Sequence, residues 1–282
     1  MDQLEMKARE FKSWSAVAPG WRKHDESLRR NTRNVVARML DLAQLQQGSH
    51  VLDIACGTGE PAIPAAKRVG PTGHVIATDY VPEMVAFARE KATALGLNNI
   101  EFRVDDGEAL QFAPDSVDAV TIRWGLMFMP DPVACLKRAH VALKPGGRIV
   151  VANWAGPERN PWATVAVGVM KRHMEIPQPP PGATGLYSFA DPARSRNLLE
   201  QAGFRRISIE ELAVPVIDTA SGEEYFTWVK EMAGPIAALY AKLSPDLQAR
   251  VDREAAEEAR RQSTVPEAVR LMGVTWIASA FK

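Results

Sequence analysis

The chain has 282 residues, a length that suits one main α/β domain with an added cap and no second independent core. Its 34 basic and 34 acidic side chains cancel, so no overall positive field gathers phosphates, and nucleic acid is disfavoured as a partner. Two cysteines, Cys56 and Cys135, are too few for a disulfide framework and lack metal-ligand spacing. We therefore expect free thiols in a reducing cytoplasm and no bound metal.

The N-terminus reads "MDQLEMKAREF", and charges occupy the place where a signal peptide needs an apolar core. No apolar run approaches the ~20 residues of a membrane span, so we expect no stable insertion into a membrane. The first 27 residues are polar with scattered aromatic side chains, and an amphipathic helix then runs from Leu28 toward Gly48.

From His50 to Trp154 the patterns of buried strands and helices alternate, with short loops between them. This alternation predicts a parallel sheet with helices on both faces. The expected helices end near Val69, span 82–95 and span 132–143, and the expected strands are "HVLDIA", "GHVIATD", "IEFRVD", "VDAVTIR" and "GRIVVANW".

After Trp154 the pattern changes to a helix over 162–174, an extended "IPQPPPG" connection, a helix from the N-cap Asp191 to Gly203, and the strand "RRISIEELAVPV". A helical insertion and a last strand, "GVTWIASAFK", follow. We expect an α/β, Rossmann-like fold with a seven-stranded, mostly parallel sheet and a helical cap over the carboxyl ends of the strands. The expected division is an N-terminal lid segment over 1–27, a core over 28–220 and 264–282, and a helical cap insertion over 221–263.

The stretch "VLDIACGTGEPA" joins a buried strand to a helix through a glycine turn, where either a nicotinamide dinucleotide or S-adenosylmethionine (SAM) can bind. The spacing Gly57-x-Gly59-x-x-Ala62 satisfies the dinucleotide fingerprint, and Asp79 lies 20 residues after Gly59. The negative charge of Asp53, however, can attract an amino-acid ammonium but would repel a pyrophosphate. Together with a further acidic pair after the third strand, Asp53 favours SAM.

Four stretches in order resemble the class I SAM-dependent methyltransferases, and most closely the UbiE-like branch of ubiquinone and menaquinone biosynthesis with its small-molecule relatives. They are "VLDIACGTG", the acid in "ATD", "VDDGEALQFAPDSVDAV" and "ALKPGGRIVV". The resemblance covers roughly residues 14 to 155 and resumes in the last strand. It implies SAM as the cofactor, S-adenosylhomocysteine as its product, and a class I methyltransferase core.

The resemblance also implies the cofactor contacts. The first turn would lie against the methionine portion, the acid of "ATD" would accept both ribose hydroxyls, and the acid of "VDDG" would accept from the adenine amino group. The residues are Asp53, Ala55, Gly57 and Gly59 at the methionine portion, Asp79 at the ribose, Tyr80 and Met84 beside the adenine, Asp106 and Gly107 at the adenine amino group and ring, and Arg123, whose backbone carbonyl would meet the methionine ammonium. Family members commonly have glycine where Ala55 stands, and alanine is small enough to be tolerated there.

Methyl transfer is an in-line displacement, so an enzyme contributes alignment, desolvation and, where needed, removal of a proton. The fourth strand ends "IRWGLMFMPD" and lacks the Asn/Asp-Pro-Pro-Tyr stretch of enzymes that methylate amino groups of DNA or glutamine. Trp14 and Trp21, which we also place at the cofactor site, are the aromatic residues least easily explained as core. We expect O- or C-methylation of a small, planar or apolar metabolite.

His24 and His173 are the candidate bases, because the other histidines fall at positions expected to be surface or structural. Two alternatives stay open at this point: an NAD(P)-dependent oxidoreductase and a non-catalytic SAM-binding protein. The insertion over 221–263 has an alternative too, since its apolar stripe could pack on a second copy in a homodimer.

Overall fold

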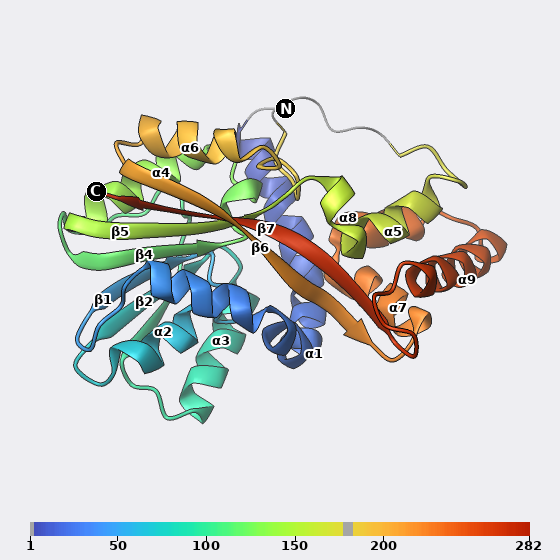
Figure 1. Cartoon of the computed structure of the whole chain (residues 1–282), viewed down its shortest axis with the longest axis horizontal. Coiled ribbons are helices and arrows are strands. Elements are labelled where there is room, and N and C mark those ends of the chain that lie inside the picture. The colour runs from blue at the N-terminus through green and yellow to red at the C-terminus, as the bar shows by residue number, and fades with distance from the viewer. Residues whose placement is uncertain (1–2, 177–182) are drawn as a thin grey trace.

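The computed structural model describes residues 3–176 and 183–282. They form one seven-stranded sheet with helices around it (Figure 1). The strand order is β3-β2-β1-β4-β5-β7-β6, with β1 to β5 parallel and β7 antiparallel to both of its neighbours. The predicted seven-stranded, mostly parallel sheet is confirmed. The strands are β1 (His50–Ile54), β2 (His74–Asp79), β3 (Ile100–Val104), β4 (Val117–Arg123), β5 (Leu143–Trp154), β6 (Arg205–Thr219) and β7 (Val269–Phe281).

β1 lies at the centre of the parallel part because its apolar side chains are buried on both faces of the sheet. Leu52 pairs with Ile76 of β2 on one side and with Val120 of β4 on the other. The strand order reverses between β1 and β4, and such a switch point leaves a crevice at the carboxyl ends of the strands. Residues directly after β1 and β4 are therefore the first that a ligand would meet.

Helices cover both faces, with α2 and α3 on one and α4 and α6 on the other (Figure 1). The helices α4 and α6 begin where the sequence predicted. The carboxylate of Asp131 accepts a hydrogen bond from the third backbone N–H group of α4, and that of Asp191 accepts one from the second N–H group of α6. The predicted helix over 162–174 ends earlier, at Met170, and residues 177–182 of the predicted "IPQPPPG" connection lie outside the described residues. The bounds are α2 (Ala62–Val69), α3 (Pro82–Ala94), α4 (Pro132–Ala142), α5 (Pro161–Met170) and α6 (Pro192–Gln201), with short 3-10 helices η1 (Leu126–Phe128) and η2 (Pro157–Arg159).

The N-terminal helix α1 (Gln3–Leu42) is longer than the sequence predicted. We expected a helix only from Leu28, but all 40 residues are helical, with Pro19 inside the helix. The polar leader is helical because Glu, Lys, Ala, Arg, Met and Gln, which dominate it, are strong helix formers. The expected boundary at residue 27 therefore falls inside a continuous helix.

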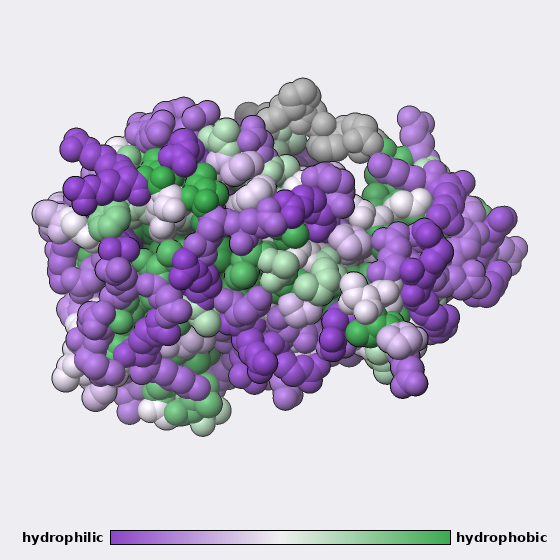
Figure 2. All heavy atoms as spheres, in the orientation of Figure 1, coloured by the Kyte–Doolittle hydropathy of each residue, from purple (hydrophilic) through white to green (hydrophobic). Residues whose placement is uncertain are grey.

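The insertion over 221–263 forms α7 (Gly222–Met232), α8 (Gly234–Tyr240) and α9 (Pro245–Arg261), beside the outer half of the β6–β7 pair (Figure 1). The apolar stripe of α9, which includes Val251, Ala255 and Ala259, is buried within the chain against α7 and α5. Hydrophilic side chains cover most of the face in Figure 2, including the outer end of this insertion. The apolar residues of α7 and α9 are thus covered within one chain, whereas Ile236, Leu239 and Tyr240 of α8 are only partly buried, and the dimer alternative stays open.

Within the described ranges, no helix combines the length and the apolar content needed to cross a lipid bilayer. The longest helix, α1, carries charged residues along most of its length.

Candidate active site

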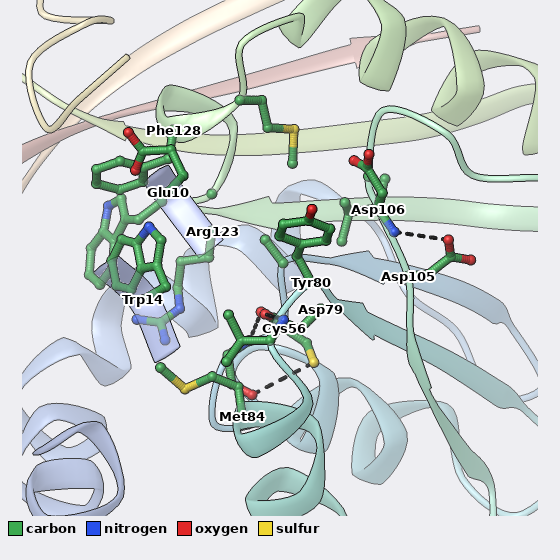
Figure 3. Close-up of a pocket in the computed structure, with 18 of the residues that line it drawn as sticks. Glu10, Trp14, Cys56, Asp79, Tyr80, Met84, Asp105, Asp106, Arg123 and Phe128 are labelled. Atoms are coloured by element: carbon green, nitrogen blue, oxygen red, sulfur yellow. Dashed lines mark hydrogen bonds between the residues drawn. The ribbon is translucent and has the colours of Figure 1, made fainter. Parts of the chain in front are cut away.

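A pocket opens at the carboxyl ends of β1, β2, β3 and β4, beneath the N-terminal half of α1 (Figure 3). The strand-end segments that line it are 54–57, 79–81, 105–108, 123–125 and 128–130. Glu60 precedes α2 and Met84 lies in the first turn of α3, and α1 contributes Lys7, Glu10, Trp14 and Trp21. All of the predicted cofactor residues line this pocket except Asp53 and Gly59.

Asp79 forms hydrogen bonds both to the turn after β1 and to the connection after β2. Its Oδ2 accepts a hydrogen bond from the backbone N–H of Gly57 at 2.8 Å, and its Oδ1 accepts from the N–H of Val81 at 2.9 Å. Burial raises the pKa of Asp79, and these backbone donors oppose that rise. Each carboxylate oxygen keeps a second lone pair, so Asp79 can still accept from two hydroxyl groups in the pocket.

Gly57 and Gly59 have different structural roles, although the sequence predicted both at the cofactor. Gly57 has φ +53, and a Cβ built on it meets no described atom within 4 Å, so this turn opens into the pocket. Gly59 has φ +103, and its Cβ would lie 2.7 Å from the Cδ1 of Ile63 in α2. Gly59 therefore allows α2 to pack on the turn, and it does not line the pocket, so its expected cofactor contact stays a prediction.

Ala55 and Gly125 bring the turns after β1 and β4 into contact at the floor of the pocket. Ala55 has φ 58, an uncommon backbone conformation for alanine. A Cβ built on Gly125 would overlap the Cβ of Ala55. Any side chain at position 125 must push the two turns apart.

We expect Gly125→Ala to lower the free energy of unfolding by about 2 kcal/mol, because overpacked sites force backbone shifts. The double variant with Ala55→Gly should recover most of that loss, since the colliding methyl group is gone. Urea unfolding of both single variants and the double variant measures the coupling. Equal loss in Gly125→Ala and in the double variant would show that this contact is not responsible.

Asp53 lies behind the turn and not on the pocket wall, and its predicted contact with an ammonium group stays a prediction. Its side chain points into the interior of the sheet, where Oδ1 accepts a hydrogen bond from Thr121 Oγ1 at 2.7 Å. Oδ2 is buried and has no hydrogen-bond partner among the described residues. Burial raises the pKa of Asp53 to about 7.

This raised pKa predicts an unusual pH dependence of stability. The folded chain keeps the Asp53 proton over a range in which the unfolded chain has released it, so the free energy of unfolding falls as the pH rises from about 4 to about 7. Asp53→Asn should flatten this fall, which amounts to at most roughly 4 kcal/mol. Urea unfolding at pH 5 and pH 8 checks it, and an unchanged slope in the variant would contradict it.

At the adenine end of the predicted site, Lys7 of α1 forms an ion-pair cluster with two acids that follow β3. Lys7 Nζ lies 2.5 Å from Asp106 Oδ2 and 2.7 Å from Glu108 Oε2, while Asp106 Oδ1 accepts from the N–H of Glu108 at 2.9 Å. Sequence reasoning missed Lys7, which lies 99 residues from Asp106. It also missed Glu10, which accepts a hydrogen bond from Thr184 Oγ1 at 3.0 Å.

One sequence signal could have found these two residues. The α1 residues that line the pocket, Lys7, Glu10, Trp14 and Trp21, are separated by three, four and seven positions. This spacing places them on one face of a helix.

An aromatic wall closes the pocket opposite Asp106. The Trp14 ring lies 4.8 Å from the Phe128 ring and 5.7 Å from the Trp21 ring, measured between centroids. Trp124 stacks on Trp154 at 4.2 Å and donates from Nε1 to Thr275 Oγ1 at 3.0 Å. The leader and the strand ends thus meet through aromatic contacts at this wall.

Arg123 extends from the end of β4 as a buried cation on the pocket wall. Its Nε donates to the backbone carbonyl of Glu60 at 3.1 Å, and its Nη1 lies 3.5 Å from Thr32 Oγ1. The guanidinium carbon lies 4.6 Å from the centroid of the Trp124 ring. Burial lowers the pKa of Arg123, and the nearby carboxylates, Glu60 first, oppose that change.

The two predicted bases are not brought to the pocket. His24 Nε2 pairs with Glu231 of α7 at 2.5 Å, and His173 Nε2 pairs with Glu254 of α9 at 3.0 Å. Neither histidine lines the pocket, and both join the insertion to the rest of the chain. Cys56 does line it, but burial raises the pKa of its thiol well above the usual value, so the thiol stays protonated at neutral pH.

Comparisons with known proteins agree with this geometry. Residues 45–176 match the family model described as a methyltransferase domain. The demethylmenaquinone methyltransferase of Listeria monocytogenes is 36% identical over 126 residues, which are 45% of this chain and 53% of that protein. The aklanonic acid methyltransferase DauC of a Streptomyces species is 41% identical over 112 residues, 40% of this chain and 51% of that protein. The chain thus spans about half the length of these curated relatives.

Among solved structures, the YcgJ protein of Bacillus subtilis shares the fold with a TM-score of 0.57 at 18% identity, over 89% of this chain and 98% of that one. A phosphoethanolamine N-methyltransferase of Haemonchus contortus, solved with phosphomonomethylethanolamine and S-adenosylhomocysteine, has a TM-score of 0.53 at 19% identity, over 88% of this chain and 52% of that one. Residues 45–176 of this chain are thus similar to a methyltransferase domain, and the chain has the Rossmann-like fold of these solved structures.

Proposed function

We propose that the chain is a SAM-dependent methyltransferase that transfers a methyl group to a small, planar or apolar metabolite, at oxygen or carbon. The observation that carries the proposal is the order of groups along one pocket. Asp106 lies at one end, Asp79 lies near the middle, and Arg123 with the aromatic wall lies at the other end (Figure 3).

The residues fit SAM. The turn at Gly57 leaves open space where the methionine portion would lie, and Asp79 offers free lone pairs for two ribose hydroxyls. At the adenine end, Asp106 would use the second lone pair of an oxygen that already accepts from Lys7 or from the N–H of Glu108, and the backbone of Gly107 would meet the ring. When bound, SAM would supply a methyl group on an electrophilic sulfonium.

The residues of the chain contribute alignment and exclusion of water in this proposal. Trp14, Trp21 and Phe128 would hold a planar acceptor against the end of β4. Glu10 is the carboxylate that Figure 3 shows beside the rings of Trp14 and Phe128, and in this proposal it takes the role of proton acceptor that we expected of His24 and His173. The names of the relatives, one acting on demethylmenaquinone and one on aklanonic acid, support an acceptor of this size.

The leader is the lid in this proposal, and the insertion over 221–263 holds it in position. A Cβ on Gly20 would overlap the backbone carbonyl of Glu231 in α7, so α1 and α7 touch at their backbones. Trp21 Nε1 also donates to the carbonyl of Met232 at 3.3 Å. The insertion therefore supports the part of α1 that lies over the pocket and carries Trp14 and Trp21.

Turnover with SAM that carries a trideuterated methyl group tests the proposal. The purified chain is incubated with a panel of phenols, hydroxyquinones and carboxylic acids, and mass spectrometry detects products that carry the label. We expect a labelled product with the wild type and none with Asp79→Ala. If S-adenosylhomocysteine binds but no panel member, nor any metabolite of a cell extract, is labelled, the chain is a SAM-binding protein without this activity.

A further inference from the structure

The N-terminal part of α1 is held to the rest of the chain differently from the remainder of the helix. Among residues 3–16 none is buried, whereas buried residues recur from Val17 onward. The remainder also has a partly buried ion pair, in which Lys91 of α3 lies 2.8 Å from Asp25. A helix segment without buried side chains separates from a fold at low cost in free energy. Residues 3–16, here called the arm, are therefore the part of α1 that can open.

A proline weakens α1 at the end of the arm. Pro19 lies inside the helix and has no N–H, so the carbonyl of Ser15 loses the hydrogen bond that position 19 would donate. Gly20 follows directly and is fixed in place, since a Cβ there would overlap the backbone carbonyl of Glu231. The turn from Ser15 to Pro19 is therefore a joint at which the arm can bend away while the rest of α1 stays in place.

Lys7 closes the arm over the loop after β3. Its Nζ lies 2.5 Å from Asp106 Oδ2 and 2.7 Å from Glu108 Oε2, and its side chain is only 23% exposed, so solvent screens this ion pair weakly. Burial alone would lower the pKa of Lys7, but hydrogen bonds to both acids raise it above its usual value. Glu108 is itself held, because its Oε1 accepts from the N–H of Asp131 at 2.8 Å. Opening of the arm must therefore separate Lys7 from both acids.

Two further contacts hold the arm less tightly. Glu10 accepts a hydrogen bond from the neutral hydroxyl of Thr184 at 3.0 Å. The ring of Phe11 lies edge-on to that of Tyr80 at 5.2 Å, and both side chains are partly open to solvent. The Lys7 ion pair is charged on both sides and is shared by two acids, so it is the strongest of these contacts.

We propose that the arm opens at this joint to admit ligands, and that Lys7 is the latch that sets how often it opens. This inference rests on the proposed function, in which the pocket takes SAM. The latch can also close over a bound ligand, because each carboxylate oxygen of Asp106 and Glu108 can accept a second hydrogen bond. Loss of the latch therefore changes the rates of ligand entry and exit together and leaves the affinity almost unchanged.

Stopped-flow tryptophan fluorescence with S-adenosylhomocysteine tests the latch, because tryptophan side chains of the arm and of the strand ends line the pocket. We expect Lys7→Met to raise the association and dissociation rate constants by about 10-fold each, as for the loss of one charge-assisted pair. The dissociation constant should change by less than about 3-fold. Pro19→Ala should lower both rate constants, because its N–H can donate to the carbonyl of Ser15 and stiffen the joint.

Lys12→Met is the matched control, since Lys12 is an exposed lysine of the same arm and does not line the pocket. Its rate constants should equal those of the wild type. If Lys7→Met raised the dissociation rate constant alone and weakened the affinity by the same factor, Lys7 would be a ligand contact and the proposal would be overturned. Rate constants in Lys7→Met equal to those of Lys12→Met would overturn it as well.

Amide hydrogen exchange without ligand tests the arm separately from the proposed function. Lys7→Met should accelerate exchange over residues 7–16 by about 10-fold, because a short helix that has separated from the fold frays in water. Exchange over residues 21–42 should stay as in the wild type. Unchanged exchange over 7–16, or equal acceleration along all of α1, would overturn the proposal. If the wild type did not bind S-adenosylhomocysteine, the proposed function would fail and the exchange rates alone would decide whether the arm opens.

Discussion

Asp79→Ala should weaken S-adenosylhomocysteine binding by at least about 100-fold while the chain stays folded. Two hydrogen bonds from ribose hydroxyls to a charged acceptor, each contributing roughly 1.5–3 kcal/mol, would be lost. The variant also removes the carboxylate that holds the N–H groups of Gly57 and Val81, so the turn itself becomes less ordered. Isothermal titration calorimetry measures the affinity, and circular dichroism checks the fold.

Asp246→Ala is a suitable control because Asp246 is an exposed acid in the first turn of α9, away from the pocket. It carries the same loss of charge and should leave the affinity unchanged. A folded Asp79→Ala that binds S-adenosylhomocysteine as tightly as the wild type would refute the placement of the ribose.

Gly57→Val should abolish measurable binding by a different route. Position 57 has φ +53, which a β-branched residue rarely adopts, and its Cβ would project into the space that the methionine portion needs. The expected result is a folded but less stable chain with no detectable heat of S-adenosylhomocysteine binding.

Gly96→Val separates backbone strain from blocking of the pocket. Gly96 follows α3 with φ +67, and a Cβ there also meets no described atom within 4 Å, but the residue does not line the pocket. This control should lose stability to a similar degree and keep its affinity. If Gly57→Val bound S-adenosylhomocysteine with normal affinity, the methionine portion could not lie against this turn.

The sheet could be predicted from the sequence because its signals are local. Apolar runs such as "HVIATD" alternate with helical patterns, and turn residues separate them. In a parallel sheet, the carboxyl ends of β1, β2, β3 and β4 lie side by side. Gly57, Asp79, Asp106 and Arg123 stand at or just after these ends, so the sequence alone predicts that they line one pocket.

The remaining features depend on contacts between distant residues. Asp53 lies on the predicted strand, but whether its carboxylate faces the pocket or Thr121 depends on how β4 packs beside β1. Lys7 and Glu10 reach the pocket only because α1 continues through the expected boundary and crosses the strand ends. His24 was a reasonable base by residue type, but its pairing with Glu231 depends on the insertion, 207 residues later.

We propose that the pocket under α1 binds SAM and not a nicotinamide dinucleotide. Trp14, Trp21 and Trp124 line this pocket, so a bound ligand should change the tryptophan fluorescence. S-adenosylhomocysteine and NAD are titrated separately into the wild-type chain, and both fluorescence and calorimetry follow the binding. We predict saturable binding of one S-adenosylhomocysteine per chain and no saturable response to NAD; micromolar binding of NAD without binding of S-adenosylhomocysteine would contradict the account.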